Sequence, residues 1–184
     1  MKGCFGNFCA GAENRICVVS PMAESNKAVC EKLDRFFADN PKVALAFSGG
    51  TDSALVLYAA KKAGCDIRPY FVKSQFQPQF ELDDALKLCG QLNIDLAILQ
   101  LDILDEENVV ANPPDRCYYC KKLIFDLIVK SAASDGYLFV IDGTNASDSI
   151  DERPGIKAMR ELGIRSPLAE CDITKTQVRE ISRV

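Results

Sequence analysis

The residues with the clearest chemical potential form one hexapeptide: Ser48, Gly49, Gly50, Thr51, Asp52 and Ser53. An apolar run of strand length, residues 43–47, precedes it, and residues 54–60 have the composition of a buried helix. Backbone N–H groups at a helix start lack partners within the helix, and the helix dipole adds partial positive charge there. The glycines permit a tight turn, the hydroxyls add donors, and Asp52 is a candidate Mg²⁺ ligand. The pattern therefore predicts an anion site.

The hexapeptide is not a Walker loop, because no Gly-Lys-Ser/Thr follows the glycines. It resembles the pyrophosphate loop of the ATP-pyrophosphatase (PP-loop) superfamily. The resemblance implies that the loop holds the β- and γ-phosphates of ATP, that an acceptor oxygen takes the adenylate, and that pyrophosphate leaves. The alternative is an ordinary turn with capping residues. The position between a strand and a helix favours the phosphate site.

Cys117 and Cys120 form a second motif, a Cys-x-x-Cys pair preceded by Arg116 and followed by two lysines. Neighbouring positive charge favours thiolate over thiol. One interpretation is an iron–sulfur cluster, which needs at least one more cysteine, and another is structural zinc, which needs two more because the chain has no histidine. A redox dithiol and two unrelated helix cysteines remain open as well.

Further candidates follow two other apolar runs. Gly143 and Thr144 belong to the segment DGTNASD at residues 142–148, where the glycine allows close approach to a nucleotide. Lys73 and Ser74 follow the run at 67–72, where the adenine or ribose of a nucleotide lies in such a fold. The proposed catalytic residues are Asp52, Lys73 and Asp148, with Asp148 a second candidate Mg²⁺ ligand. The candidate phosphate clamps are Arg153, Arg160 and Arg165.

These motifs lie between strands that alternate with helices. We expect strands at 43–47, 67–72, 96–101, 138–141 and 164–166, and helices at 21–39, 54–60, 79–92, 117–133 and 152–162. A last helix should begin at residue 174, where Thr174 and Gln177 have the spacing of a capping box. Such alternation predicts an α/β fold with a three-layer, doubly wound parallel sheet of about five strands. We expect residues 1–40 to form an N-terminal segment and helix, and residues 41–184 to form the nucleotide-binding domain, with ligands at the carboxyl ends of the strands.

Composition narrows the possible functions. The 184 residues carry a net charge of −4, from 22 basic and 26 acidic side chains, which gives no basic footprint for a long nucleic-acid surface. The absence of histidine excludes a nucleophile activated by histidine. Nine cysteines, no recognisable signal peptide and no membrane-spanning stretch predict a protein of the reducing cytoplasm.

Five stretches together resemble LarE-type sulfur transferases: SGGTDS at 48–53, NPPDRCYYCK at 112–121, DGTNASD at 142–148, residues 152–170, and TKTQVRE at 174–180. The resemblance implies that ATP and Mg²⁺ adenylate a carboxylate of pyridinium-3,5-biscarboxylic acid mononucleotide. The product is a thiocarboxylate for the nickel-pincer cofactor. Members with a Cys-x-x-Cys pair hold a 4Fe-4S cluster through three cysteines, and this cluster carries sulfide from a donor. The resemblance also implies a homo-oligomer.

The chain departs from the family at its end. Members continue into a Cys-Leu-Ala-Ser-Arg segment that supplies the third cluster ligand or a sacrificial cysteine, whereas this sequence stops at Val184. We therefore expect a fragment, with Cys171 as the nearby substitute. The alternative functions are tRNA thiolation, ATP-dependent amide synthesis, and nucleotide binding without turnover. The negative net charge argues against tRNA, and we expect neither a nucleic-acid nor a membrane partner.

Overall fold

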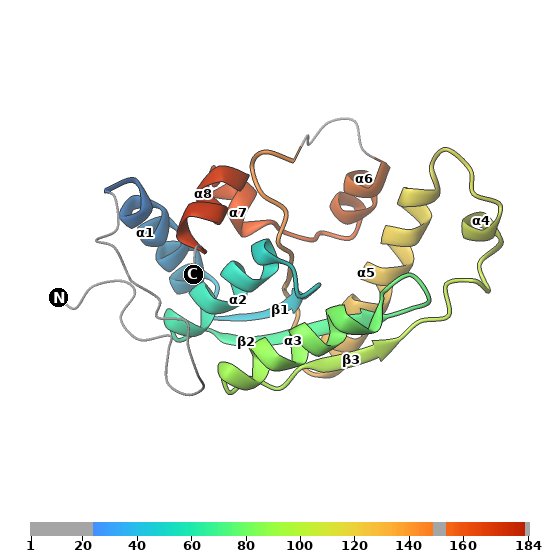
Figure 1. Ribbon diagram of the computed structural model, residues 1–184, viewed down its shortest axis with the longest axis horizontal. Helices are drawn as coiled ribbons and strands as arrows, with labels where there is room; N and C mark the ends of the chain where they lie inside the picture. Colours follow the sequence, from blue (N-terminus) through green and yellow to red (C-terminus); the bar gives the residue numbers. More distant parts are fainter. Residues whose placement is uncertain (1–23, 149–153, 183–184) are drawn as a thin grey trace.

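A computed structural model describes residues 24–148 and 154–182 of the chain, and Figure 1 shows its ribbon. Strands and helices alternate along most of the chain. In order they are α1 (Glu24–Asp39), β1 (Lys42–Ala46), α2 (Thr51–Lys62), β2 (Asp66–Lys73), α3 (Gln79–Gln91), β3 (Ala97–Gln100), α4 (Glu107–Val110), α5 (Arg116–Ser134), β4 (Val140–Ile141), α6 (Pro154–Glu161), α7 (Pro167–Glu170) and α8 (Lys175–Ile181).

The strands form one sheet in the order β3-β2-β1-β4, and each neighbouring pair is parallel. The predicted α/β, doubly wound fold class is confirmed, but the sheet has four strands in the described part of the chain, not about five. The fifth predicted strand, residues 164–166, contributes only an isolated bridge between Ile141 and Arg165. It ends there because Pro167, which has no N–H to donate, opens α7.

Helices cover both faces of the sheet, so successive strand residues are buried on opposite sides. Val43 and Leu45 of β1 pack into a core with α1, α2, α3, α7 and α8, whereas Ala44 belongs to a second core with α5 and α6. All three side chains are fully buried. This burial explains why β1 is a continuous apolar run with no polar alternation.

Two short helices, α4 and α7, were not predicted from the sequence, and α2 begins at Thr51, three residues before the predicted start. Leu33 and Phe37 of α1 lie in the same core as β1 and α2. The predicted domain boundary near residue 40 stays a prediction. Residues 1–23, which include the first three cysteines, lie outside the described residues.

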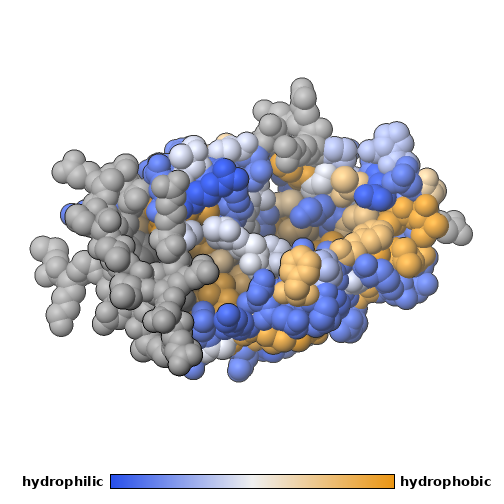
Figure 2. Space-filling model, viewed as in Figure 1, coloured by the Kyte–Doolittle hydropathy of each residue, from blue (hydrophilic) through white to orange (hydrophobic). Residues whose placement is uncertain are grey.

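Hydrophobic residues reach the surface near the end of the molecule that carries α4 (Figure 2). Leu104 and Val110 are about half exposed there, in the segment that leads to α5. Within the described ranges, none of the helices is both long enough and apolar enough to cross a lipid bilayer.

Candidate active site

The site lies where the sheet changes its winding direction. β1 and β4 are neighbours, but β1 leads into α2 on one face, while α5, which leads back to β4, covers the opposite face. Ligands of doubly wound sheets bind in this crevice, outside the carboxyl ends of the strands. A cavity of about 280 Å³ opens there. Its wall is polar near the loops after β1 and β4, and apolar near α5, where Ile124, Phe125 and Ile128 line it.

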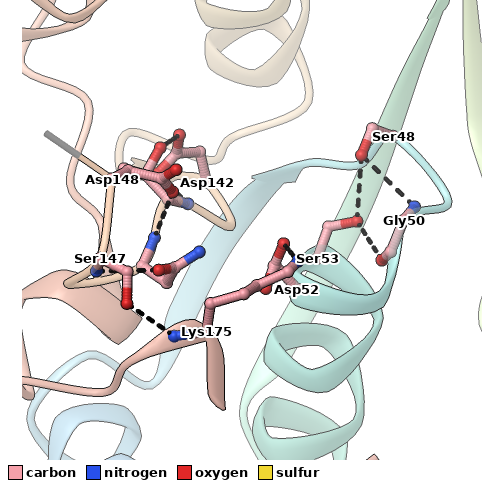
Figure 3. A network of polar contacts seen from close by, with 10 residues as sticks. Ser48, Gly50, Asp52, Ser53, Asp142, Ser147, Asp148 and Lys175 are labelled. Atoms are coloured by element: carbon pink, nitrogen blue, oxygen red, sulfur yellow. Dashed lines mark hydrogen bonds and ion pairs between the residues drawn. The ribbon is translucent and has the colours of Figure 1, made fainter. Parts of the chain in front are cut away.

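The loop after β1 has the geometry of an anion site (Figure 3). Gly49 has a φ of +75°, which other residues rarely adopt, and its turn directs the chain into α2. The Ser53 hydroxyl donates to the Gly50 carbonyl at 3.0 Å and lies 3.3 Å from the Ser48 hydroxyl. Gly50, the residue before α2, provides no side-chain cap. The first N–H groups of α2 are therefore available to a phosphate.

The loop after β4 interlocks with this first loop. A Cβ atom on Gly143 would lie 2.7 Å from the backbone nitrogen of Ser53 and 3.0 Å from its Cα, so only glycine fits. Next to it, the buried Asp142 carboxylate accepts hydrogen bonds from the Thr144 backbone N–H and hydroxyl and from the Ser166 hydroxyl. Burial raises the pKa of Asp142, and these hydrogen bonds and Lys121 lower it in part. Asp142 therefore shapes the loop that touches α2.

Two carboxylates of the cavity wall match the predicted metal ligands, Asp52 and Asp148. One Asp52 oxygen pairs with the Lys175 ammonium, and its other oxygen, Oδ1, is buried without a hydrogen-bond partner in the described structure. Asp148 Oδ2 accepts from the Asn145 N–H at 3.1 Å. A buried oxygen without a partner is costly unless a cation or donor binds it. The donor set, carboxylate oxygens beside a phosphate site, fits Mg²⁺.

The sequence did not predict that two lysines belong to the site, because each comes from a segment distant from the PP-loop. Lys175 is the first residue of α8, which the predicted capping box of Thr174 and Gln177 opens. Lys121 lines the cavity from α5, one residue after the Cys-x-x-Cys pair, and its ammonium lies 5.4 Å from the centroid of the Phe125 ring. The TKTQ signal could have indicated the position of Lys175 at a helix start, but not its contact with Asp52.

Other predicted site residues lie apart from the cavity wall. Lys73 donates a hydrogen bond to the Gln77 backbone carbonyl, and the Ser74 hydroxyl donates to the Gln77 side chain. Both residues therefore contact a residue of the cavity wall but do not line the cavity themselves. Thr51 is exposed at the start of α2. Arg165 pairs with Glu170 and does not line the cavity. Arg153 lies outside the described residues. The assignment of these residues to the site stays a prediction.

Cys117 and Cys120 lie one turn apart in α5, the first exposed and the second half-buried. Burial raises the pKa of Cys120, and the nearby Arg116 charge partly opposes this. Among the residues that the structure describes, no group of three histidine, cysteine, aspartate or glutamate side chains can hold a metal ion. The pair therefore supplies two ligands, which is too few for a cluster or a structural zinc site.

Charge at Lys175 should matter for nucleotide binding, since its ammonium pairs with Asp52 at the phosphate end of the cavity. We expect Lys175→Met to raise the KM for ATP about tenfold to a hundredfold, the range for losing one hydrogen bond to a charged group. Steady-state pyrophosphate release at varied ATP measures this change. Lys61→Met, which removes an exposed charge at the far end of α2, is the control. Equal KM values in the two variants would exclude this role of Lys175.

Comparison with known proteins agrees with this geometry. Residues 42–111 match the family described as queuosine biosynthesis protein QueC. The pyridinium-3,5-bisthiocarboxylic acid mononucleotide synthase of Lactiplantibacillus plantarum is 37% identical over 147 residues, which are 79% of this chain and 53% of that protein. The chain spans between 53% and 58% of the length of the first three curated relatives that it matches.

Two solved structures share the fold. The NMN synthetase of Francisella tularensis has a TM-score of 0.67 at 21% identity, with 85% of this chain and 68% of that chain covered. The U34-tRNA thiolase NcsA of Methanococcus maripaludis, solved with its [4Fe-4S] cluster, has a TM-score of 0.65 at 19% identity, with 86% and 62% covered.

The fold, the glycine-bearing loop after β1 and the interlocked loop after β4 define the PP-loop, or ATP-pyrophosphatase, class. Within this class the chain is similar over 79% of its length to a LarE-type synthase, the resemblance that its sequence motifs indicate.

Proposed function

We propose that this chain is the ATP-binding, adenylating part of a LarE-type sulfur transferase. Its acceptor would be a carboxylate of pyridinium-3,5-biscarboxylic acid mononucleotide, on the route to the nickel-pincer cofactor. The observation that supports this most is the contact between Gly143 and Ser53, which holds the loop after β4 against the phosphate loop beside Asp52 and Asp148. The 37% identity to the Lactiplantibacillus plantarum synthase supports the choice of acceptor.

In the proposed reaction, the carboxylate oxygen of the acceptor attacks the α-phosphorus of ATP. The bond between that phosphorus and the bridging oxygen to the β-phosphate breaks, and the electron pair leaves with pyrophosphate. The N-terminus of α2 holds the phosphates, and Lys175 offsets negative charge at the same end of the cavity. Asp52 and Asp148 would hold Mg²⁺, which supplies charge stabilisation for the departing pyrophosphate when bound.

Adenylation prepares the carboxyl carbon for sulfur. The adenylate converts a poor leaving oxygen into AMP, and sulfide then attacks the carbon and displaces AMP to give the thiocarboxylate. The apolar wall from α5 is suited to the adenine ring, since aromatic and aliphatic side chains there exclude water. The sulfide donor and the homo-oligomer remain predictions.

For the Cys-x-x-Cys pair we retain the predicted 4Fe-4S cluster as the proposal, with zinc as the alternative. The tRNA thiolase of the same fold contains such a cluster. Cys117 and Cys120 would supply two of its ligands, and the described residues supply no third. We expect Cys117→Ser and Cys120→Ser each to reduce bound iron to background after anaerobic reconstitution, whereas Cys89→Ala, a buried thiol of α3, leaves iron binding unchanged. Iron and acid-labile sulfide assays measure cluster content in each variant. Wild-type protein that binds zinc but no iron would contradict the proposed cluster.

The acceptor is tested by anaerobic incubation of the chain with ATP and Mg²⁺, with either the pyridinium mononucleotide or bulk tRNA added. Mass spectrometry then identifies any adduct that carries AMP. An adduct with the pyridinium mononucleotide alone is expected. An adduct with tRNA alone would replace the proposed acceptor with a tRNA, the substrate class of the thiolase that shares the fold.

A further inference from the structure

Glu81 occupies an unassigned position in the cavity. It lies in the first turn of α3, and its backbone carbonyl would be 3.1 Å from a Cβ atom on Gly49, so this turn abuts the PP-loop. The Glu81 side chain is half-buried and lines the cavity. Among the described residues, no hydrogen-bond or ion-pair partner is found for its carboxylate. A half-buried charge without a partner, facing a ligand cavity, is a candidate binding group.

The chemistry of the cavity restricts what Glu81 can bind. A carboxylate repels the phosphates, and the phosphate end already carries Asp52 and Asp148. The apolar wall suited to a base comes from α5, on the opposite face of the sheet from α3. A nucleotide with its phosphates at α2 and its base at α5 would have its ribose between the two, inside the cavity that the Glu81 side chain also lines.

Gln77, a neighbouring polar residue of the cavity wall, is not available to accept hydrogen bonds from a ligand in the same way. The Gln77 side-chain oxygen already accepts hydrogen bonds from the Ser74 N–H and hydroxyl, at 3.2 and 2.5 Å. Of the two described residues of this turn that line the cavity, Gln77 and Glu81, only Glu81 thus keeps a free side-chain acceptor. A carboxylate has two oxygens, which match the two adjacent hydroxyl donors of a ribose.

We propose that Glu81 accepts hydrogen bonds from the 2′- and 3′-hydroxyls of bound ATP and so selects ribonucleotides over deoxyribonucleotides. This inference rests on the proposed function, because it presupposes that ATP is the nucleotide in the cavity.

The test compares binding of ATP and 2′,3′-dideoxyATP, each with Mg²⁺ and without an acceptor, by isothermal titration calorimetry. We expect the wild type to bind ATP about tenfold or more tightly than the dideoxy analogue, the effect of losing hydrogen bonds to a charged group. We expect Glu81→Ala to bind both nucleotides with the weaker affinity, and Glu81→Gln to fall between. Asp84→Ala, an exposed carboxylate on the same helix and outside the cavity wall, should retain the full discrimination.

The outcomes separate the two claims. Wild-type protein that binds neither nucleotide would refute the proposed function, and the inference with it. Wild-type protein that discriminates, with equal discrimination in Glu81→Ala, would refute the inference alone. Equal loss of affinity for both nucleotides in Glu81→Ala would also refute it, since that pattern indicates a role toward phosphate or metal.

Discussion

Replacing Asp52 with asparagine is expected to lower the rate of acceptor-dependent pyrophosphate release by about a hundredfold to a thousandfold, the range for losing one group that stabilises the transition state. The amide keeps the size of the side chain but cannot balance the charge of Mg²⁺. One Asp52 oxygen is buried without a hydrogen-bond partner among the described residues, and the residue lines the cavity, so its charge is suited to a bound cation. Single-turnover release of pyrophosphate measures the effect.

The control for this variant is Asp95→Asn, which removes an exposed carboxylate outside the cavity wall and should leave the rate unchanged. The double variant Asp52→Asn/Lys175→Met adds a second check. Because the two side chains form an ion pair, their effects should be non-additive, and the double variant should be little worse than Asp52→Asn. If Asp52→Asn released pyrophosphate at a rate within a few-fold of the wild type, that result would contradict the role of Asp52 as a metal ligand.

Replacing Gly143 with alanine is the second large change. The new methyl group would meet the Ser53 backbone at 2.7 Å, and backbone atoms at the start of α2 cannot move aside as a flexible side chain can. We expect the loops to separate, at a cost of about 1–3 kcal/mol in the free energy of unfolding. ATP affinity should fall more than tenfold, since the separated loops no longer hold the phosphates and metal ligands together. Urea unfolding and calorimetry measure the two quantities.

Gly90→Ala is the matched control, because nothing lies within 4 Å of a Cβ atom there and the residue is inside α3. This variant should keep its ATP affinity and gain up to about 1 kcal/mol of stability from the better helix propensity of alanine. Unchanged ATP binding in Gly143→Ala would show that the contact between the loops is dispensable.

The sequence predicted the parts of the fold that depend on local patterns. Continuous apolar runs located β1, β2, β3 and β4, and the glycines at 49 and 50 located the turn into α2. Their order along the chain also indicated that the loops after β1 and β4 lie at the same edge of the sheet. The capping box at Thr174 was correct to the residue.

The remainder depends on contacts between distant segments, which a local pattern does not record. Lys175 meets Asp52 across 123 positions of sequence. Arg165, considered as a phosphate clamp, stacks instead near the Phe36 ring, with 4.9 Å between the guanidinium carbon and the ring centroid. Residues 164–166 have the composition of a strand, but the chain turns into α7 directly after them, so they form only one isolated bridge to the sheet. Lys121 reaches the cavity because α5 covers that face of the sheet, a consequence of topology.

The most direct test of the central claim is the fate of ATP labelled at the α-phosphate, incubated with the chain, Mg²⁺ and the pyridinium mononucleotide. Cleavage between the α- and β-phosphates should place the label in an AMP adduct of the acceptor, with unlabelled pyrophosphate released in equal amount. Label recovered in ADP, with free phosphate as the other product, would mean that the bond between the β- and γ-phosphates breaks. That result would contradict an adenylating site at the Asp52 loop.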